Sequence, residues 1–183
     1  MTEKRPSALR RMARIAMMTV VICLCAWLTV PFTVPFTMQT FGVFAALLLL
    51  GGGDGTAAIG LYLLLGCVGL PVFSGFSGGP GHLLGPTGGY LLGFLFTGLA
   101  HILVGKRIAR CAAAARVALL FAEHALCYLV GTLWFVTVMG SRGTPCDFFT
   151  ALGLCVAPYI LPDLVKIGLA DFVSRRVGKY LAK

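Results

Sequence analysis

The sequence predicts an all-α polytopic membrane protein: a six-transmembrane-helix bundle with re-entrant, irregular outer loops and cytoplasmic N- and C-termini. The first observation is composition, because 58% of the 183 residues are hydrophobic and 11% are charged, with a mean hydropathy of +0.94. A soluble domain carries about 25% charged residues. The second observation is length, since a chain of this size holds about six spans of ~20 residues joined by short connections.

The third observation is the placement of the basic residues, which orients the chain. Most of them fall in three clusters beside apolar segments: Lys4, Arg5, Arg10, Arg11 and Arg14; Lys106, Arg107, Arg110 and Arg116; and Arg175, Arg176, Lys179 and Lys183. Short cytoplasmic loops carry such an excess of Lys and Arg. The net charge of +9 therefore orients the protein in a bilayer. It does not indicate nucleic-acid binding, for which the sequence offers no basic and aromatic reading surface.

We expect a single membrane domain over residues 1–183, with helices near residues 9–30, 40–53, 56–70, 87–104, 117–139 and 159–176. The first helix follows a basic turn and lacks a small-residue cleavage site, so we interpret it as a retained span. Pro31 and Pro35 end it, because the residue before a proline is pushed toward extended backbone. Hydroxyl groups and Gln39 are the polar side chains of the uncharged outer connector that follows.

Two later segments are shorter than a full span. The second helix has only ten apolar residues before the glycines at 51–55, which is about 15 Å of helix. Asp54 in that inner turn is expected to cap the third helix. Residues 147–158 are helical by pattern but too short to cross, and we expect a half-helix on the outer side that precedes the sixth helix.

A glycine-rich and aromatic stretch at residues 69–94 connects the third and fourth helices. It reads GLPVFSGFSGGPGHLLGPTGGYLLGF and contains no Lys, Arg, Asp or Glu. Irregular backbone at membrane depth must be buried in protein or line a cavity, because lipid cannot satisfy its amides. We therefore expect this stretch to form one wall of a ligand pocket.

The same stretch resembles the BioY family, the biotin-specific substrate-capture (S) components of energy-coupling-factor (ECF) transporters. The resemblance is carried by GLPVF at 69–73 and GPTGGYLLGF at 85–94, and by two further segments, PFTMQTF at 35–41 and the Pro162-Asp163…Lys166 element. It extends over roughly residues 30–166. It implies a transport protein of the cell membrane that binds biotin with high affinity and passes it inward.

Ionisable residues within membrane helices are costly and are therefore candidates for function. They are His101, Glu123, His124, Asp163, Lys166 and Asp171. Asp163 and Lys166 share one helix face, and spacing alone leaves open whether they bind a ligand or only pair with each other near a helix N-terminus. The resemblance implies that both bind substrate. For Glu123 we expect an interhelical contact near the inner end with Arg116 or Lys106, and for His101 an interfacial position.

Biotin offers two ureido N–H donors, a ureido carbonyl and a carboxylate. Asp163 suits the N–H groups, and Lys166 suits either the ureido oxygen or the carboxylate. Apolar and aromatic walls are usual in small-molecule pockets, and Thr87 adds a hydroxyl. Gly88 and Gly89 are expected to let backbone amides approach the ligand. His82 stands where family members often have another polar side chain. The predicted substrate-binding residues are Asp163, Lys166, Tyr90, Thr87, Gly88, Gly89, Phe73, Gln39, Tyr159 and His82.

No catalytic residue, metal site or cofactor is expected, because biotin would be the transported ligand and the seven cysteines show no metal-binding spacing. The chain also lacks a nucleotide-hydrolysis motif. The resemblance implies partners that supply energy: the membrane coupling subunit and the ATPase subunits of an ECF module. We expect a multi-pass protein of the bacterial cytoplasmic (inner) membrane. The alternatives are an S component for another vitamin, a small membrane enzyme, and a facilitator that works alone.

Overall fold

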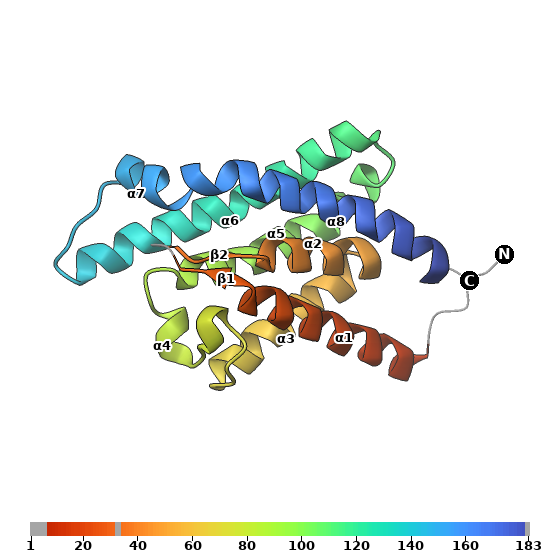
Figure 1. The fold of residues 1–183 in the computed structure, drawn as a ribbon, viewed down its shortest axis with the longest axis horizontal. Helices are drawn as coiled ribbons and strands as arrows, with labels where there is room; N and C mark the ends of the chain where they lie inside the picture. The colour runs from red at the N-terminus through yellow and green to blue at the C-terminus, as the bar shows by residue number, and fades with distance from the viewer. Residues whose placement is uncertain (1–6, 32–33, 182–183) are drawn as a thin grey trace.

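The structure is a computed structural model that describes residues 7–31 and 34–181 (Figure 1). The basic residues Lys4, Arg5 and Lys183 and part of the first connector lie outside these ranges. The described chain is almost entirely helical. The start of α1 and the end of α8 lie at the same end of the bundle (Figure 1).

The first third of the chain forms three helices and a small hairpin. Helix α1 covers Ala8–Trp27, strands β1 (Thr29–Val30) and β2 (Phe36–Thr37) pair antiparallel, and helix α2 covers Gln39–Leu50. The outer connector is thus partly ordered by strand pairing. Helix α3 covers Gly52–Cys67, so it begins four residues earlier than the expected boundary at 56.

Glycines explain the early start of α3. A Cβ added to Gly52 would lie 2.7 Å from the Cα of Ile102, and one added to Gly55 would lie 2.7 Å from the Cα of Leu47. These glycines are therefore helical residues that allow close packing, and they do not form an open turn. Asp54 lies in the first turn of α3 and pairs with Arg11 at 2.6 Å, so the expectation that it caps the helix was wrong.

The glycine-rich stretch folds into two short helical turns, followed by two long helices. The turns are η1 (Ser74–Phe76) and α4 (Pro80–Leu83), and the long helices are α5 (Gly88–Ile108) and α6 (Ala113–Ser141). Helix α5 extends four residues beyond its expected end at 104, and α6 begins four residues before its expected start at 117. The alanine-rich residues after 112 are strong helix formers, and they belong to α6.

The C-terminal part contains the expected half-helix and the last long helix. Helix α7 covers Phe148–Cys155, the 3₁₀ turn η2 covers Ala157–Tyr159, and α8 covers Ile160–Leu181. Asp147 caps α7, because its carboxylate accepts hydrogen bonds from the backbone N–H of Phe149 and Thr150. The Thr150 hydroxyl also donates to this carboxylate, and its hydrogen bond, followed by the two backbone bonds, lowers the pKa of Asp147 below its usual value.

The helices pack so that α2 lies in the middle of the bundle. It contacts α1, α3 and α8, while α5 runs along α6. Residues Val43–Leu47 of α2 are fully or almost fully buried. Helix α8 crosses the face of the bundle above α2 and α6 (Figure 1), and this crossing places α8 beside the connector that precedes α2.

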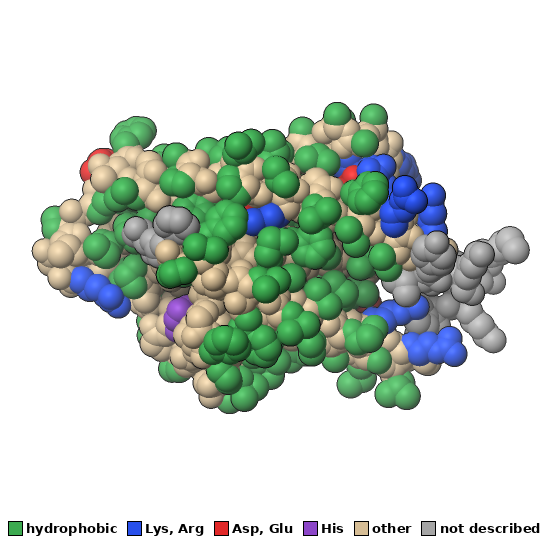
Figure 2. Space-filling view, in the orientation of Figure 1, with side chains coloured by type: hydrophobic (Ala, Val, Ile, Leu, Met, Phe, Trp, Pro, Cys, Tyr) green, Lys and Arg blue, Asp and Glu red, His purple; other side chains and the backbone are tan. Residues whose placement is uncertain are grey.

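Three segments of the described chain are long and apolar enough to cross a membrane by themselves: Gly88–Ile108, Ala113–Ser141 and Phe148–Lys179. Helices α2 and α3 have 12 and 16 residues, and α1 carries three arginines near its start. Hydrophobic side chains cover most of the face in Figure 2, and most Lys and Arg side chains gather at the end where α1 begins and α8 ends. The protein is an all-α membrane protein, as predicted.

Candidate binding site

A pocket with about 600 Å³ of empty space, counted to its open mouth, lies between the connector, the glycine-rich stretch, α5, α6 and α8. Its lining contains seven of the ten predicted substrate-binding residues: Gln39, His82, Thr87, Tyr90, Tyr159, Asp163 and Lys166. Segments that are far apart in the sequence therefore form one cavity. The other lining residues are Val34, Pro35, Thr37, Thr40, Ser74, Leu91, Phe94, His124, Cys127, Tyr128 and Cys155.

An acid–amine pair from α8 forms one end of the pocket. Lys166 Nζ donates a hydrogen bond of 2.8 Å to Asp163 Oδ1, and each residue is only 5% exposed. The ammonium group also lies 3.9 Å from the centre of the Phe36 ring, a favourable cation–π contact. Burial makes both charges expensive unless they are paired, so this pair offers a ligand one strong acceptor and one strong donor.

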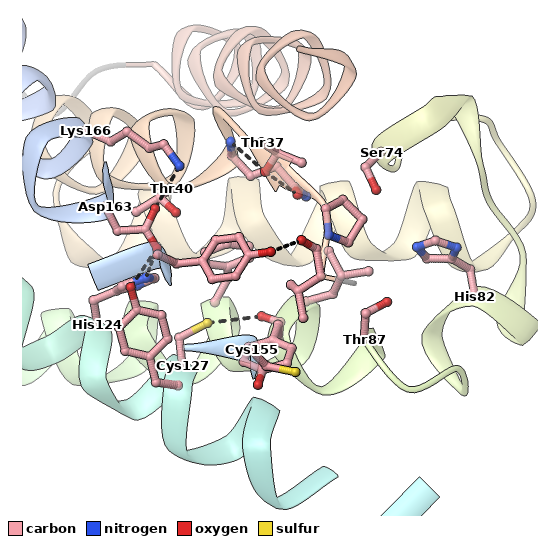
Figure 3. Close-up of a pocket in the computed structure, with 18 residues that line it drawn as sticks. Thr37, Thr40, Ser74, His82, Thr87, His124, Cys127, Cys155, Asp163 and Lys166 are labelled. Carbon is pink, nitrogen blue, oxygen red and sulfur yellow. Dashed lines mark hydrogen bonds and ion pairs between the residues drawn. The ribbon is translucent and has the colours of Figure 1, made fainter. Parts of the chain in front are cut away.

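Helix α6 supplies two further groups to the same carboxylate. Tyr128 Oη donates to Asp163 Oδ2 at 2.7 Å, and His124 Nε2 lies 3.3 Å from the same oxygen. The two residues are four apart on α6 and therefore share a helix face. In Figure 3, His124 and Lys166 approach Asp163 from different sides.

The opposite end of the pocket is formed by Ser74, His82 and Thr87 (Figure 3). His82 belongs to α4 and stacks on Phe73, with ring centres 5.3 Å apart. Partial burial lowers the pKa of His82 below its usual value. Thr87 is the N-cap residue of α5, so this end of the pocket lies at a helix N-terminus, where negative charge is favoured.

Three predicted residues form the wall between the two ends. Tyr90 Oη lies 3.2 Å from Thr132 Oγ1, and Tyr159 Oη donates to the carbonyl oxygen of Val34 in the connector. The Gln39 side chain donates to Tyr62 Oη at 2.6 Å and accepts from Thr37 at 2.8 Å. These contacts hold the wall in place. They also engage the side-chain amide of Gln39 in hydrogen bonds within the protein.

Phe73, Gly88 and Gly89 lie outside the pocket lining. The Phe73 ring is fully buried, packs against Gly66 and stands edge-on to Tyr62 at 5.3 Å. An added Cβ would collide with the Leu83 carbonyl at Gly88 and with the Trp134 side chain at Gly89. In the structure these two glycines allow tight packing of α5 against α4 and α6, and the approach of their backbone amides to a ligand stays a prediction.

Sequence reasoning did not select His124 or Tyr128 as site residues, and it mispaired Glu123. Glu123 Oε2 lies 2.9 Å from His101 Nδ1, and both residues are buried, so His101 is the partner of Glu123. Arg116 instead pairs with Asp171 at 2.6 Å. The available signal was the i, i+4 spacing of His124 and Tyr128, next to the intramembrane acid Glu123. This spacing shows that the two side chains share a helix face, but it does not show which other helix packs against that face.

Within the described residues, no three His, Cys, Asp or Glu side chains lie close enough to hold a metal ion, and all seven cysteines are free thiols. The polar groups of the site are instead hydrogen-bond donors and acceptors that line one pocket. Such a site binds an uncharged or zwitterionic polar group at one end and an apolar body along its aromatic wall.

Comparison with known proteins agrees with this architecture. The sequence model of the BioY family matches residues 1–183. A probable biotin transporter of Pyrococcus horikoshii is 38% identical over 145 residues, which are 79% of this chain and 80% of that protein. The biotin transporter of Thermotoga maritima is 34% identical over 178 residues, which are 93% of this chain and 97% of that protein.

A crystal structure shows the same fold. It is that of the S-component for biotin from an ECF-type ABC transporter, with a TM-score of 0.81 and 27% identity, and the match covers 97% of this chain and 95% of that chain. The fold and the pocket, with its acid–amine pair and aromatic wall, define a membrane-embedded small-molecule capture protein with the S-component fold. The chain belongs to the BioY family, a family of transporters and not of enzymes.

Proposed function

We propose that this chain captures biotin and delivers it across the cytoplasmic membrane as the substrate-specific subunit of an ECF-type transporter. The observation that carries the proposal is that the Asp163–Lys166 pair and the glycine-rich stretch line one cavity, with an aromatic wall between them. Membership of the BioY family supports the same ligand. Biotin is the transported substrate in this proposal, and no cofactor is involved.

The two ends of the pocket suit the two ends of biotin. The ureido ring presents N–H donors and a carbonyl acceptor side by side, which match a carboxylate and an ammonium group that are 2.8 Å apart. In this arrangement Lys166 donates a hydrogen bond to the ureido oxygen. The carboxylate tail extends toward Ser74, His82 and Thr87, where hydroxyl groups and the N-terminus of α5 favour an anion.

The proposed topology has six spans, with irregular outer segments and both termini in the cytoplasm of a bacterial cell. It is supported by the basic clusters at one end of the bundle (Figure 2) and by the positive-inside rule. The short helices α2 and α3 are covered by α1, α5 and α8, so their limited length is compatible with a place inside the bundle. The pocket then opens toward the outer side, between the connector and α4.

Active uptake in this proposal depends on partners, the membrane coupling subunit and the ATPase subunits of an ECF module. The experiment is a binding competition with the purified chain in detergent. Labelled biotin should be displaced by unlabelled biotin but not by an excess of riboflavin, thiamine or folate. Equal displacement by another vitamin would reassign the ligand, and a failure of biotin to bind would remove the proposal.

A further inference from the structure

The Asp163 carboxylate accepts three hydrogen bonds from the protein itself. Oδ1 accepts from Lys166, and Oδ2 is shared by Tyr128 and His124. An ionised carboxylate offers about four acceptor positions, so about one position is left for a ligand. Of the three bonds, the one from His124 is the longest, at 3.3 Å.

The surroundings of His124 define how its ring is protonated. The residue is 1% exposed, and its ring contacts Phe94 at 6.0 Å, Phe44 at 5.8 Å and Tyr128 at 4.6 Å between centres. Nδ1 is buried and has no hydrogen-bond partner among the described residues. A buried N–H without an acceptor is costly, whereas Nε2 faces a carboxylate that can only accept. The hydrogen therefore belongs on Nε2.

We propose that His124, with a hydrogen on Nε2, is a positioning residue that holds the Asp163 carboxylate in its binding orientation together with Tyr128. This inference rests on the proposed function, because the orientation matters for the ligand that Asp163 receives. Its consequence is that Asp163 accepts one ureido N–H from biotin and not two, since His124 and Tyr128 keep Oδ2 engaged in the complex.

Two substitutions of His124 distinguish a role as hydrogen-bond donor from a role in packing. His124→Phe keeps an aromatic ring between Phe44 and Phe94 but has no N–H, while His124→Gln supplies an N–H without a ring. If the N–H positions Asp163, His124→Phe should lose about ten-fold or more in biotin affinity, as expected for a hydrogen bond to a charged group. His124→Gln should stay within about three-fold of wild type.

A purely structural role predicts the reverse order, because the phenyl ring would preserve the packing and the amide would not. Affinities are measured by titration of biotin into each purified variant, and thermal unfolding without biotin shows that each one is folded. Thr137→Ala, an exposed site on the same helix, is the matched control. Wild-type affinity in both variants, loss in both, or the reversed order would each overturn the proposal.

A second measurement does not depend on biotin. The chain has only three histidines, so selective ¹⁵N-histidine labelling gives a simple spectrum, and His124→Phe identifies the His124 signals. A hydrogen on Nε2 is expected both without and with biotin. A ring without a hydrogen on Nε2 would overturn the inference even if biotin binds. Loss of biotin binding by the wild-type chain would instead count against the proposed function, while the protonation of His124 would still be measured.

Discussion

Lys166 Nζ lies 2.8 Å from Asp163 Oδ1, one helical turn away on α8, and neither residue is more than 5% exposed. The opposite charges of the two side chains balance each other, and the pair presents both a hydrogen-bond donor and an acceptor to the pocket. A group that recognises the pair must therefore contain a donor and an acceptor close together, and a cyclic urea meets that requirement. Breaking the pair leaves one buried charge without its partner, which is costly.

Substitution of either partner should weaken biotin binding strongly. Asp163→Asn and Lys166→Ala should each reduce affinity by about 2 kcal/mol or more, because a buried polar partner is left unpaired. The double variant should lose less than the sum of the two, since the residues share one interaction. Titration calorimetry measures all three. Asp54→Asn at the distant Arg11 pair should bind like wild type, and unchanged affinity in the Asp163 and Lys166 variants would disprove the site.

Biotin affinity should depend on pH through His82. Burial lowers the pKa of His82 from its ordinary value, so the ring is neutral at pH 7, and a nearby ligand carboxylate favours its protonated form. Binding then takes up a proton, and affinity should rise as pH falls from about 7.5 to about 5.5. His82→Asn should bind with little pH dependence over this range. If the biotin affinity of the wild-type chain did not change over this pH range, the biotin carboxylate would not lie beside His82.

Gly88 and Gly89 should matter for stability. An added methyl group would meet the Leu83 carbonyl or the Trp134 side chain, and overpacking of this kind costs about 1–3 kcal/mol. Gly88→Ala and Gly89→Ala should therefore unfold at lower temperature in the absence of biotin. Gly81→Ala is the control, because nothing lies within 4 Å of its added Cβ. Melting temperatures equal to wild type would show that these glycines have another role.

The Arg116–Asp171 pair should hold α6 against α8 without contributing to binding. Arg116 Nε lies 2.6 Å from Asp171 Oδ1, and both residues are buried outside the pocket lining. Asp171→Asn should lower the free energy of unfolding by about 3 kcal/mol, since it leaves a buried guanidinium uncompensated. The folded fraction should bind biotin like wild type. Arg11→Gln, which breaks an exposed pair, should change the unfolding temperature much less, and an equal effect of both would contradict this assignment.

The sequence was sufficient to predict the membrane class, the order of the long helices and seven of the 18 residues that line the pocket. Apolar segment length and basic clusters are local signals, and they do not depend on how helices pack. The acid–amine spacing of Asp163 and Lys166 is also local, because both lie within one turn. Family resemblance then indicated that this pair and the glycine-rich stretch belong to the same site.

The residues that sequence reasoning missed or misplaced all depend on contacts between helices. His124 and Tyr128 are recognised only when α6 is seen to face α8, and Glu123 finds its partner on α5 across 22 residues of sequence. The packing role of Gly88 and Gly89 was missed as well, because a pattern cannot show that the Leu83 carbonyl and the Trp134 side chain lie beside these glycines. Helix periodicity shows which residues share a helix face, but it does not show which faces of different helices pack together.

Titration of biotin into the purified chain, without any coupling or ATPase subunit, tests the central claim most directly. The account predicts saturable binding of one biotin per chain with nanomolar affinity. It also predicts that Lys166→Ala, folded to the same extent as wild type, binds much more weakly. Absence of saturable binding to the folded wild-type chain, or full affinity in Lys166→Ala, would contradict it.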